Sequence, residues 1–330
     1  MQKFFFLICI FVSILLSIQS YAAVITVDGN HPSAGMYKNL KDAHDAANSG
    51  DTILVYPFAG QYSGIAVKKR LRIVGRGWYD VAGKNISTAI SGTIQFVYGS
   101  GGSSLEGFEY NFWVIIDANN ISIKRNDLEG IEIKSGHSGT IIMHNYIYSN
   151  VEKSIKVYND NEVFIANNII INTAYSSSDT FYCVYAPGNS ITINIIHNII
   201  NGDDKYSLYI KNSNYNVANN IIINGSINPK DHSGFHNNIC KSNQLCTSHG
   251  NMINIDISTV YSGSWYKLKE NSPAIGAGTN GTDIGIYGGS TPFVLGGYPS
   301  IPRIVNIEAD HLGTKSHGLD VKIKATTVRE

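Results

Sequence analysis

The sequence has little charge, few cysteines and almost no long apolar runs. Charged residues make up 15% of its 330 residues, and 25 basic side chains balance 25 acidic ones. A chain without net charge has no whole-molecule attraction for nucleic acid or for an acidic polymer, so any such attraction must be local. The 4 cysteines show no Cys/His spacing typical of a zinc site. We therefore expect neither a nucleic-acid partner nor a zinc-stabilised fold.

The longest apolar run lies at the N-terminus. It covers residues 4–18 after Lys3, and small residues follow at Ser20 and Ala22, the two positions that a signal peptidase reads. The run is shorter than the roughly 18 or more apolar residues of a membrane span. We predict a signal peptide over residues 1–22. The protein is then secreted, periplasmic or held at the cell surface, with no membrane span after cleavage.

Three cysteines remain after this segment. Exported proteins form disulfides, and Cys240 and Cys246, which flank a short loop, are the candidate pair. Cys183 lies in an apolar and aromatic segment that favours a β-strand, and we expect it to be a buried, unpaired side chain.

What the sequence has in abundance is a repeated tetrad, with Asn at its second position and an apolar residue at its fourth. The steps between these asparagines range from 18 residues (Asn220 to Asn238) to 30 residues (Asn168 to Asn198). Repetition at a period of about 20 to 50 residues indicates a solenoid or a similar array. The central asparagines are Asn126, Asn145, Asn168, Asn198, Asn220 and Asn238.

Short strand signals rich in β-branched residues separate the tetrads, with Gly, Asn, Asp and Ser turns between them. No stretch of helical period lies between the strands, which disfavours a doubly wound α/β fold. Successive coils must then stack their strands in parallel. A buried Asn amide donates and accepts, so it satisfies backbone groups at the turn and the Asn of the next coil. Asn also tolerates the left-handed conformation of a sharp corner.

The two ends of the repeat differ from it. Residues 37–47 place Leu40, Ala43, Ala46 and Ala47 at helical spacing, and a short helix here would cap the open end of a solenoid core. At the other end, we expect residues 291–302 to be a linker and residues 303–330 to be a C-terminal β tail, because so few residues cannot bury a core of their own.

With these features the chain resembles the right-handed parallel β-helix proteins of the pectin-lyase-like superfamily, over roughly residues 24–290. The matching features are the entry helix and strand, the asparagine tetrads, and a closing segment that reads SPAIGAG at 272–278 and DIGIYGG at 283–289. The resemblance implies an all-β fold, a single-stranded right-handed parallel β-helix over residues 23–290. It also implies an exported bacterial protein whose partner is a polysaccharide or a cell-surface glycan.

A dense mixture of acids, bases and histidines lies between residues 129 and 160. In this superfamily, charged residues that project from one sheet across several coils build polysaccharide grooves. A lyase needs a cation for the uronate carboxylate and a base for the C5 proton. The candidate catalytic residues are Lys134, Lys156 and His137. The candidate substrate-binding residues are Glu132, Glu152, Tyr146, Tyr148, Tyr158 and Asp160.

The same residues have an ordinary structural explanation. Alternating polar side chains are typical of any exposed sheet face, and tyrosines fill packing positions in strands as readily as they stack on sugar rings. If the site is a lyase site, Glu132 and Glu152 could hold Ca²⁺ through oxygen ligands; otherwise no cofactor is required.

Two branches of the superfamily allow a closer comparison. In the alginate and chondroitin lyase branch, the stretch matching 151–160 carries a calcium-binding pair of Glu and a catalytic Lys. Here Glu152 matches the first Glu, but Ser154 replaces the second and Asn159 stands at the Lys position. The polygalacturonase branch uses clustered Asp, and the pair Asp203-Asp204 is better explained as a turn. The lyase motif is therefore not intact.

Two functions remain open from the sequence. The first is a glycan-binding or scaffold β-helix, and the alternative is an enzyme, either a polysaccharide lyase or a glycoside hydrolase. An aromatic groove without converging ionisable groups would indicate binding, whereas carboxylates or lysines gathered in one groove would indicate catalysis. The sequence names no substrate, metal or oligomeric state.

Overall fold

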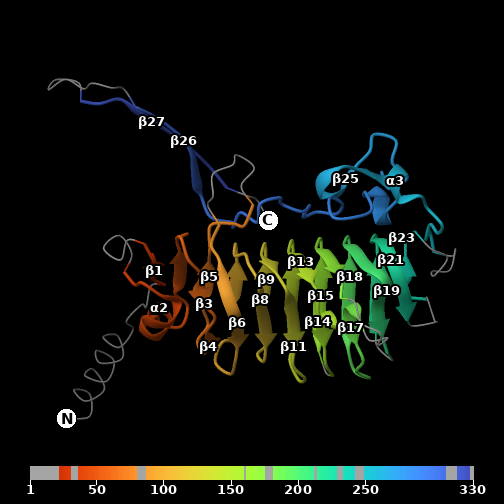
Figure 1. Cartoon of the computed structure of the whole chain (residues 1–330), viewed down its shortest axis with the longest axis horizontal. Coiled ribbons are helices and arrows are strands. Elements are labelled where there is room, and N and C mark those ends of the chain that lie inside the picture. Colours follow the sequence, from red (N-terminus) through yellow and green to blue (C-terminus); the bar gives the residue numbers. More distant parts are fainter. Residues whose placement is uncertain are drawn as a thin grey trace, which may run out of the picture.

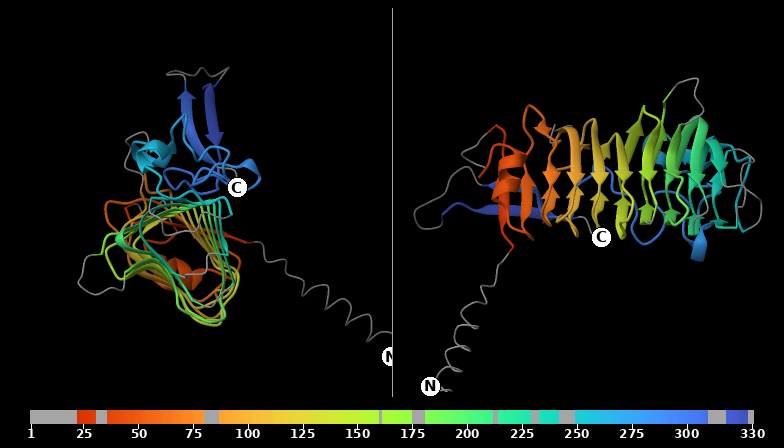
Figure 2. Two further views of the ribbon diagram at one scale, coloured as in Figure 1. Left: turned by 90° about the vertical axis from the view of Figure 1, so that its right-hand side faces the viewer. Right: turned by 90° about the horizontal axis from the view of Figure 1, so that it is seen from below.

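The computed structural model describes residues 22–30, 36–79, 87–159, 161–174, 181–211, 214–228, 233–241, 249–309 and 318–327. Parallel strands stack in successive coils along one axis (Figure 1). Viewed along that axis, the coils enclose a roughly triangular core (Figure 2). The parallel β-helix predicted from the sequence is confirmed.

The coils contribute to a ten-stranded sheet, called sheet 1, and to a thirteen-stranded sheet with two arms, called face 2 and face 3, which join through β19 and β21. Sheet 1 contains β1 (Val24–Val27), β2 (Thr52–Val55), β5 (Arg72–Val74), β7 (Ser104–Glu106), β9 (Ser122–Lys124), β12 (Thr140–Met143), β15 (Glu162–Ala166), β18 (Thr192–Ile196), β20 (Asn214–Ala218) and β22 (Phe235–His236). Face 2 contains β10 (Asp127–Leu128), β13 (Tyr146–Ser149), β16 (Ile169–Asn172), β23 (Ile239–Cys240) and the first residues of β19 (Ile199–Ile210) and β21 (Ile221–Asn228). Face 3 contains β4 (Ala66–Val67), β6 (Ile90–Phe96), β8 (Phe112–Ile116), β11 (Gly130–Ile133), β14 (Lys153–Val157), β17 (Tyr182–Ala186) and the last residues of β19 and β21, and β3 (Tyr62–Ser63) pairs with the start of β6.

The core is built from columns of aliphatic side chains, one from each coil. On face 3, one such column is in register through five coils and is fully buried; it contains Val114, Ile131, Ile155, Val184 and Leu208. Burying one such side chain contributes about 1.5–3 kcal/mol. Because the side chains of a strand alternate between its two sides, the same register aligns the outward-facing residues into columns too.

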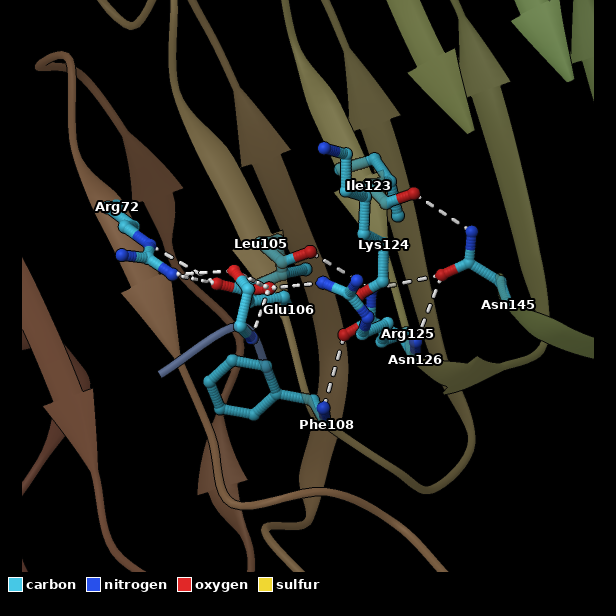
Figure 3. A network of polar contacts seen from close by, with 10 residues as sticks. Arg72, Leu105, Glu106, Phe108, Ile123, Lys124, Arg125, Asn126 and Asn145 are labelled. Atoms are coloured by element: carbon cyan, nitrogen blue, oxygen red, sulfur yellow. Dashed lines mark hydrogen bonds and ion pairs between the residues drawn. The ribbon is translucent and has the colours of Figure 1, made fainter. Parts of the chain in front are cut away.

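The tetrad asparagines form a continuous column at the corner between sheet 1 and face 2. The backbone N–H of Asn126 donates to Oδ1 of Asn145 (3.0 Å), and that of Asn145 donates to Oδ1 of Asn168 (2.8 Å). Each side-chain amide also donates to carbonyl oxygens of sheet 1, as Asn126 does to the carbonyl of Leu105 (Figure 3). The column continues to Asn251, which the tetrad pattern did not predict.

The left-handed corner conformation belongs to a different residue from the one we expected. The residue before each tetrad Asn has positive φ, whereas the Asn itself does not. These corner residues are Arg125, His144, Asn167, His197, Asn219 and Asn237. In each tetrad, the first residue therefore adopts the left-handed conformation that turns the chain, and the second residue makes the hydrogen bonds of the turn.

Helix α2 (Leu40–Ala46) lies across the N-terminal end of the core (Figure 2). Asn39 caps it by accepting a hydrogen bond from the backbone of Asp42 at 2.8 Å. Leu40 and Ala43 are buried, but Ala46 is exposed and His44 is buried in its place. Among the described residues, no helix is long and apolar enough to cross a membrane.

Residues 251–300, here called the C-terminal strap, pack on the outside of face 2. Its elements are α3 (Ile257–Val260), β24 (Tyr261–Ser262), η1 (Ser264–Tyr266), β25 (Lys267–Leu268) and η2 (Thr279–Gly281). A second hydrophobic core forms beneath it and includes Ile169, Ile199, Ile221 and Ile239 from face 2 and Val260, Ala274, Ile284, Ile286 and Phe293 from the strap. The third residue of these tetrads is thus buried by the strap, while the fourth is buried inside the coil.

The corner residues also hold the strap in place. The Asn167 amide donates to the carbonyl of Ile286 (2.8 Å), and Oδ1 of Asn219 accepts from the backbone of Thr279 (2.9 Å). Within the expected linker, residues 291–302, Phe293 and Tyr298 are buried. This segment packs against the coils.

The end of the strap meets a buried ion network on sheet 1 (Figure 3). Glu106 accepts from Arg72 on one side and from Arg125, at 3.2 Å, on the other. Both Glu106 and Arg125 are buried, and Arg72 also donates to the hydroxyl of Ser300 at 3.0 Å. The antiparallel hairpin of β26 (Arg303–Ala309) and β27 (Val321–Thr326) follows, and its residues are largely exposed.

Several predicted features lie outside the described residues. These are the signal peptide up to residue 21, Asp160 and Cys246. Cys240 is buried, and its pairing with Cys246 stays a prediction. Cys183 is fully buried as expected, and burial raises the pKa of its thiol to about 12.

Candidate functional site

The outer surface of face 3 brings together most of the polar residues singled out in the sequence. Strand register aligns Glu132 of β11, Lys156 of β14, Tyr185 of β17 and Tyr209 of β19 in one outward-facing column. A second column starts at Lys153 and continues through Tyr182 and Tyr206. We call this surface, with Tyr158, Lys134 and Glu152 at its edge, the tyrosine–lysine face.

Four tyrosine rings on this surface are in mutual contact. Tyr182 and Tyr206 stack with ring centroids 5.0 Å apart, and Tyr185 and Tyr209 lie 5.1 Å apart. Tyr182 joins the two pairs, since its ring lies 5.1 Å from Tyr185 and 5.4 Å from Tyr209. Three of the four rings are only partly buried. The result is a continuous aromatic platform across two coils.

One lysine contacts the aromatic platform, and two more contact the neighbouring ring of Tyr158. The ammonium of Lys153 lies 5.0 Å from the Tyr185 ring centroid, and those of Lys156 and Lys134 lie 4.8 and 5.7 Å from the Tyr158 centroid. Such contacts are worth about 0.5–1 kcal/mol at exposed sites. They hold the ammonium groups beside the tyrosine rings.

Two glutamates pair with these lysines. Glu132 contacts Lys134 and lies 4.0 Å from Lys156, and Glu152 pairs with Lys153 at 2.7 Å. The hydrogen bond to Lys153 lowers the pKa of Glu152. A hydrogen bond to Tyr158, assisted by the charge of Glu132, raises the pKa of Lys156. Lys156 is therefore cationic at neutral pH and suited to hold an oxygen ligand.

The structure separates the other predicted residues from this surface. His137 lies in the turn after β11, where its Nε2 is 2.8 Å from Oδ1 of Asp117. Tyr146 and Tyr148 belong to β13 on face 2. The Tyr146 ring packs against Trp78 (5.9 Å) and Trp265 (5.8 Å). The tyrosines listed together from the sequence thus serve two different faces.

Two carboxylates of interest were missed in the sequence. Asp127 of β10 is in register with Tyr146, and its backbone N–H donates to the carbonyl of Phe108, which aligns it with Glu109. Burial, and then the charge of Glu109, raises the pKa of Asp127 to about 7. Burial also raises the pKa of Glu109. Nothing in the sequence marks this pair, because 18 residues separate its members and only the coil register joins them.

Among the described residues, no group of three or more His, Cys, Asp or Glu side chains is arranged to hold a metal ion. Calcium binding at Glu132 and Glu152 stays a prediction, and both carboxylates are engaged by lysines.

No family model matches the chain, and no curated protein is similar to it. Among solved structures, the chain is similar to the crystal structure of pectate lyase Pel9A, with 14% sequence identity and a TM-score of 0.45. The similarity covers 82% of this chain and 96% of that one. No residue's role is carried over from it.

Proposed function

We propose that this chain is an exported β-helix protein that binds polysaccharide along its tyrosine–lysine face. The observation that carries the proposal is the platform of Tyr182, Tyr185, Tyr206 and Tyr209, which the Lys153 ammonium contacts. A sugar ring presents an apolar side to an aromatic ring and hydroxyls to polar groups, and this surface offers both kinds of partner side by side.

The energetics favour a moderate affinity. Aromatic contacts are worth about 0.5–1.5 kcal/mol each beyond area burial. Binding also costs about 4 kcal/mol or more, because the ligand loses translational and rotational freedom. A single sugar would therefore bind weakly, and useful affinity would come from a polymer that contacts several rings at once.

Binding suits the surface better than uronate elimination does. Elimination needs a neutral base near the C5 proton, whereas Lys156 is held in its charged form by Tyr158 and Glu132. Lys134 is paired with Glu132, and the described contacts of the His137 ring are with Asp117. These groups are therefore suited to hold a ligand by charge and by hydrogen bonds.

Affinity electrophoresis or calorimetry with pectate, alginate, chondroitin sulfate and xylan tests the proposal. We expect binding to at least one of them, and a loss of about 2- to 12-fold in affinity with Tyr185→Ala or Tyr209→Ala, the range that about 0.5–1.5 kcal/mol per ring implies. Tyr98→Ala is the matched control, because Tyr98 is 96% exposed and lies outside the platform.

Failure of every polysaccharide to bind, or equal effects of Tyr98→Ala and Tyr185→Ala, would sink the proposal. The lyase alternative has its own measurement, the absorbance of unsaturated uronate with and without Ca²⁺. A rise in absorbance that Lys156→Gln abolishes would assign elimination to this face instead.

A further inference from the structure

The part of face 2 that lies on the N-terminal side of the strap carries a second group of outward-facing residues. Hydrogen bonds between coils align Ala89, Glu109, Asp127 and Tyr146 in one column, since Ala89 bridges to Glu109 and Asp127 pairs with Tyr146. Neighbouring strands lie about 4.8 Å apart. The Glu109 and Asp127 side chains therefore project side by side from adjacent coils.

A cavity opens at the Glu109 end of this column. It has a volume of about 720 Å³, and its lining includes the amides of Asn30 and Gln61, the hydroxyls of Ser87 and Ser91, and the Glu109 carboxylate. The ring of Phe58 forms an apolar part of its wall. Cavities of roughly 300–1,000 Å³ with a few converging polar groups are typical of small-molecule sites. Amides, hydroxyls and one aromatic ring are groups that bind a sugar residue.

An aromatic wall stands at the other end of the column, beyond Asp127. Trp265 lies 5.8 Å from Tyr146, 5.7 Å from Trp78 and 5.0 Å from Tyr79, measured between ring centroids. Tyr148 extends the wall, with its ring parallel to that of Tyr146 and 6.4 Å away. The two carboxylates thus lie between a polar cavity and a packed aromatic cluster, of which Tyr79 and Tyr148 are the exposed members.

The environment sets the two carboxylates apart from ordinary surface acids. Within the described part of the chain, no hydrogen bond reaches the Asp127 carboxylate, and its pKa near 7 leaves a substantial protonated fraction at neutral pH. Burial raises the pKa of Glu109 as well, but a hydrogen bond from Ser87 opposes this shift, and Asp127 has no such bond among the described contacts. Environments that give neighbouring carboxyl groups different protonation states are the basis of acid–base pairs.

We propose that this column of residues, with the cavity beside Glu109, is a glycoside-cleaving site in which Asp127 is the general acid and Glu109 is the nucleophile. Asp127 gives its proton to the glycosidic oxygen as the bond from that oxygen to the anomeric carbon breaks. The Glu109 carboxylate attacks the anomeric carbon and forms an ester. Asp127 then takes a proton from water, whose oxygen displaces Glu109 and regenerates both groups.

The spacing of the coils also determines the stereochemistry. Carboxyl groups about 5–5.5 Å apart retain the anomeric configuration, whereas a separation of about 6.5–9.5 Å leaves room for water and inverts it. Side chains that project from strands about 4.8 Å apart fit the first case. This site lies on a different face from the tyrosine–lysine face and does not depend on binding there.

The test follows reducing-end release by the full chain from xylan, arabinan, polygalacturonate and β-glucan. We expect release from at least one of them, and a loss of about 100-fold or more with Asp127→Asn and with Glu109→Gln, because acid–base catalysis contributes about 10²–10⁴-fold. Glu162→Gln, which alters an exposed carboxylate on sheet 1, should keep the wild-type rate. Circular dichroism of each variant separates loss of chemistry from loss of fold.

Two further measurements assign the roles of the two carboxylates. Azide should restore cleavage by Glu109→Ala and yield a glycosyl azide, and NMR of the first product should show retention at the anomeric carbon. No release from any of the four polysaccharides, a wild-type rate with Asp127→Asn, or inversion of configuration would overturn the proposal. Loss of cleavage with Tyr185→Ala in place of Asp127→Asn would move the chemistry to the other face.

Discussion

Replacing one tetrad asparagine should cost far more than its small side chain suggests. Asn198 is fully buried and occupies the middle of the asparagine column. Its amide donates to the carbonyls of Ile165 and Ile196, both at 2.9 Å, and to Oδ1 of Asn220 at 3.0 Å. Its Oδ1 accepts from the backbone N–H of Asn168 at 2.9 Å. Alanine at this position would make none of these bonds.

The magnitude follows from the groups left behind. Asn198→Ala leaves the N–H of Asn168 buried without this partner and removes the amide's bond to the carbonyl of Ile165. A buried polar group without a partner costs about 1–3 kcal/mol and a lost hydrogen bond about 0.5–1.5 kcal/mol, so the two together predict a loss of about 1.5–4.5 kcal/mol in the free energy of unfolding. Asn198→Asp should be no better, because it keeps the acceptor, loses both amide donors and buries a charge.

Urea unfolding followed by circular dichroism measures the effect as a shift of the midpoint. The matched control is Asn194→Ala on the neighbouring strand β18, where the Asn makes a long 3.4 Å contact with Asn216 at the exposed surface. We expect the control to change the unfolding free energy by less than about 0.5 kcal/mol. If Asn198→Ala and Asn194→Ala shift the midpoint equally, the amide column does not stabilise the corner as argued.

Two other predictions concern stability. Burial lowers the pKa of His197, so the stability that its neutral imidazole contributes is fully present above the unfolded pKa of about 6.5 and is lost as pH falls below it. Acidification from pH 8 to 5 should therefore destabilise the wild type more than His197→Asn. Parallel pH profiles of the two proteins in thermal unfolding would contradict this. Glu106→Gln should lower the free energy of unfolding by about 3–5 kcal/mol, because it removes the buried carboxylate that pairs with both Arg72 and Arg125. A thermal midpoint within about 1 °C of the wild type would refute it.

The strap shows why the covering of a surface is hard to predict from its pattern. The tetrads at Ile169, Ile199 and Ile221 each have two consecutive isoleucines, so both sides of the strand are apolar. Such a pattern indicates a strand that is buried on both sides, but it does not say by what. The cover comes from residues that include Ala274 and Ile284, which lie far along the chain.

The candidate sites show the same limit. Lys134, Lys156, Glu132 and Tyr158 were found in the sequence because they lie close together in it. Tyr146 was grouped with them for the same reason, and the structure places it on another face, since a coil turns through two corners within about twenty residues.

The sequence by itself determined the repeat, the parallel β-helix and the six tetrad asparagines of the buried column. It could do so because every coil meets the same local requirements, so that Asn at the corner and Ile two residues later recur with the coil. Only the tertiary structure decided which residues of different coils become neighbours. Glu109 meets Asp127, and Tyr182 meets Tyr206, because strands stack in register about 4.8 Å apart. That register depends on the length of every intervening turn, and coils here vary in length, so no local pattern contains it.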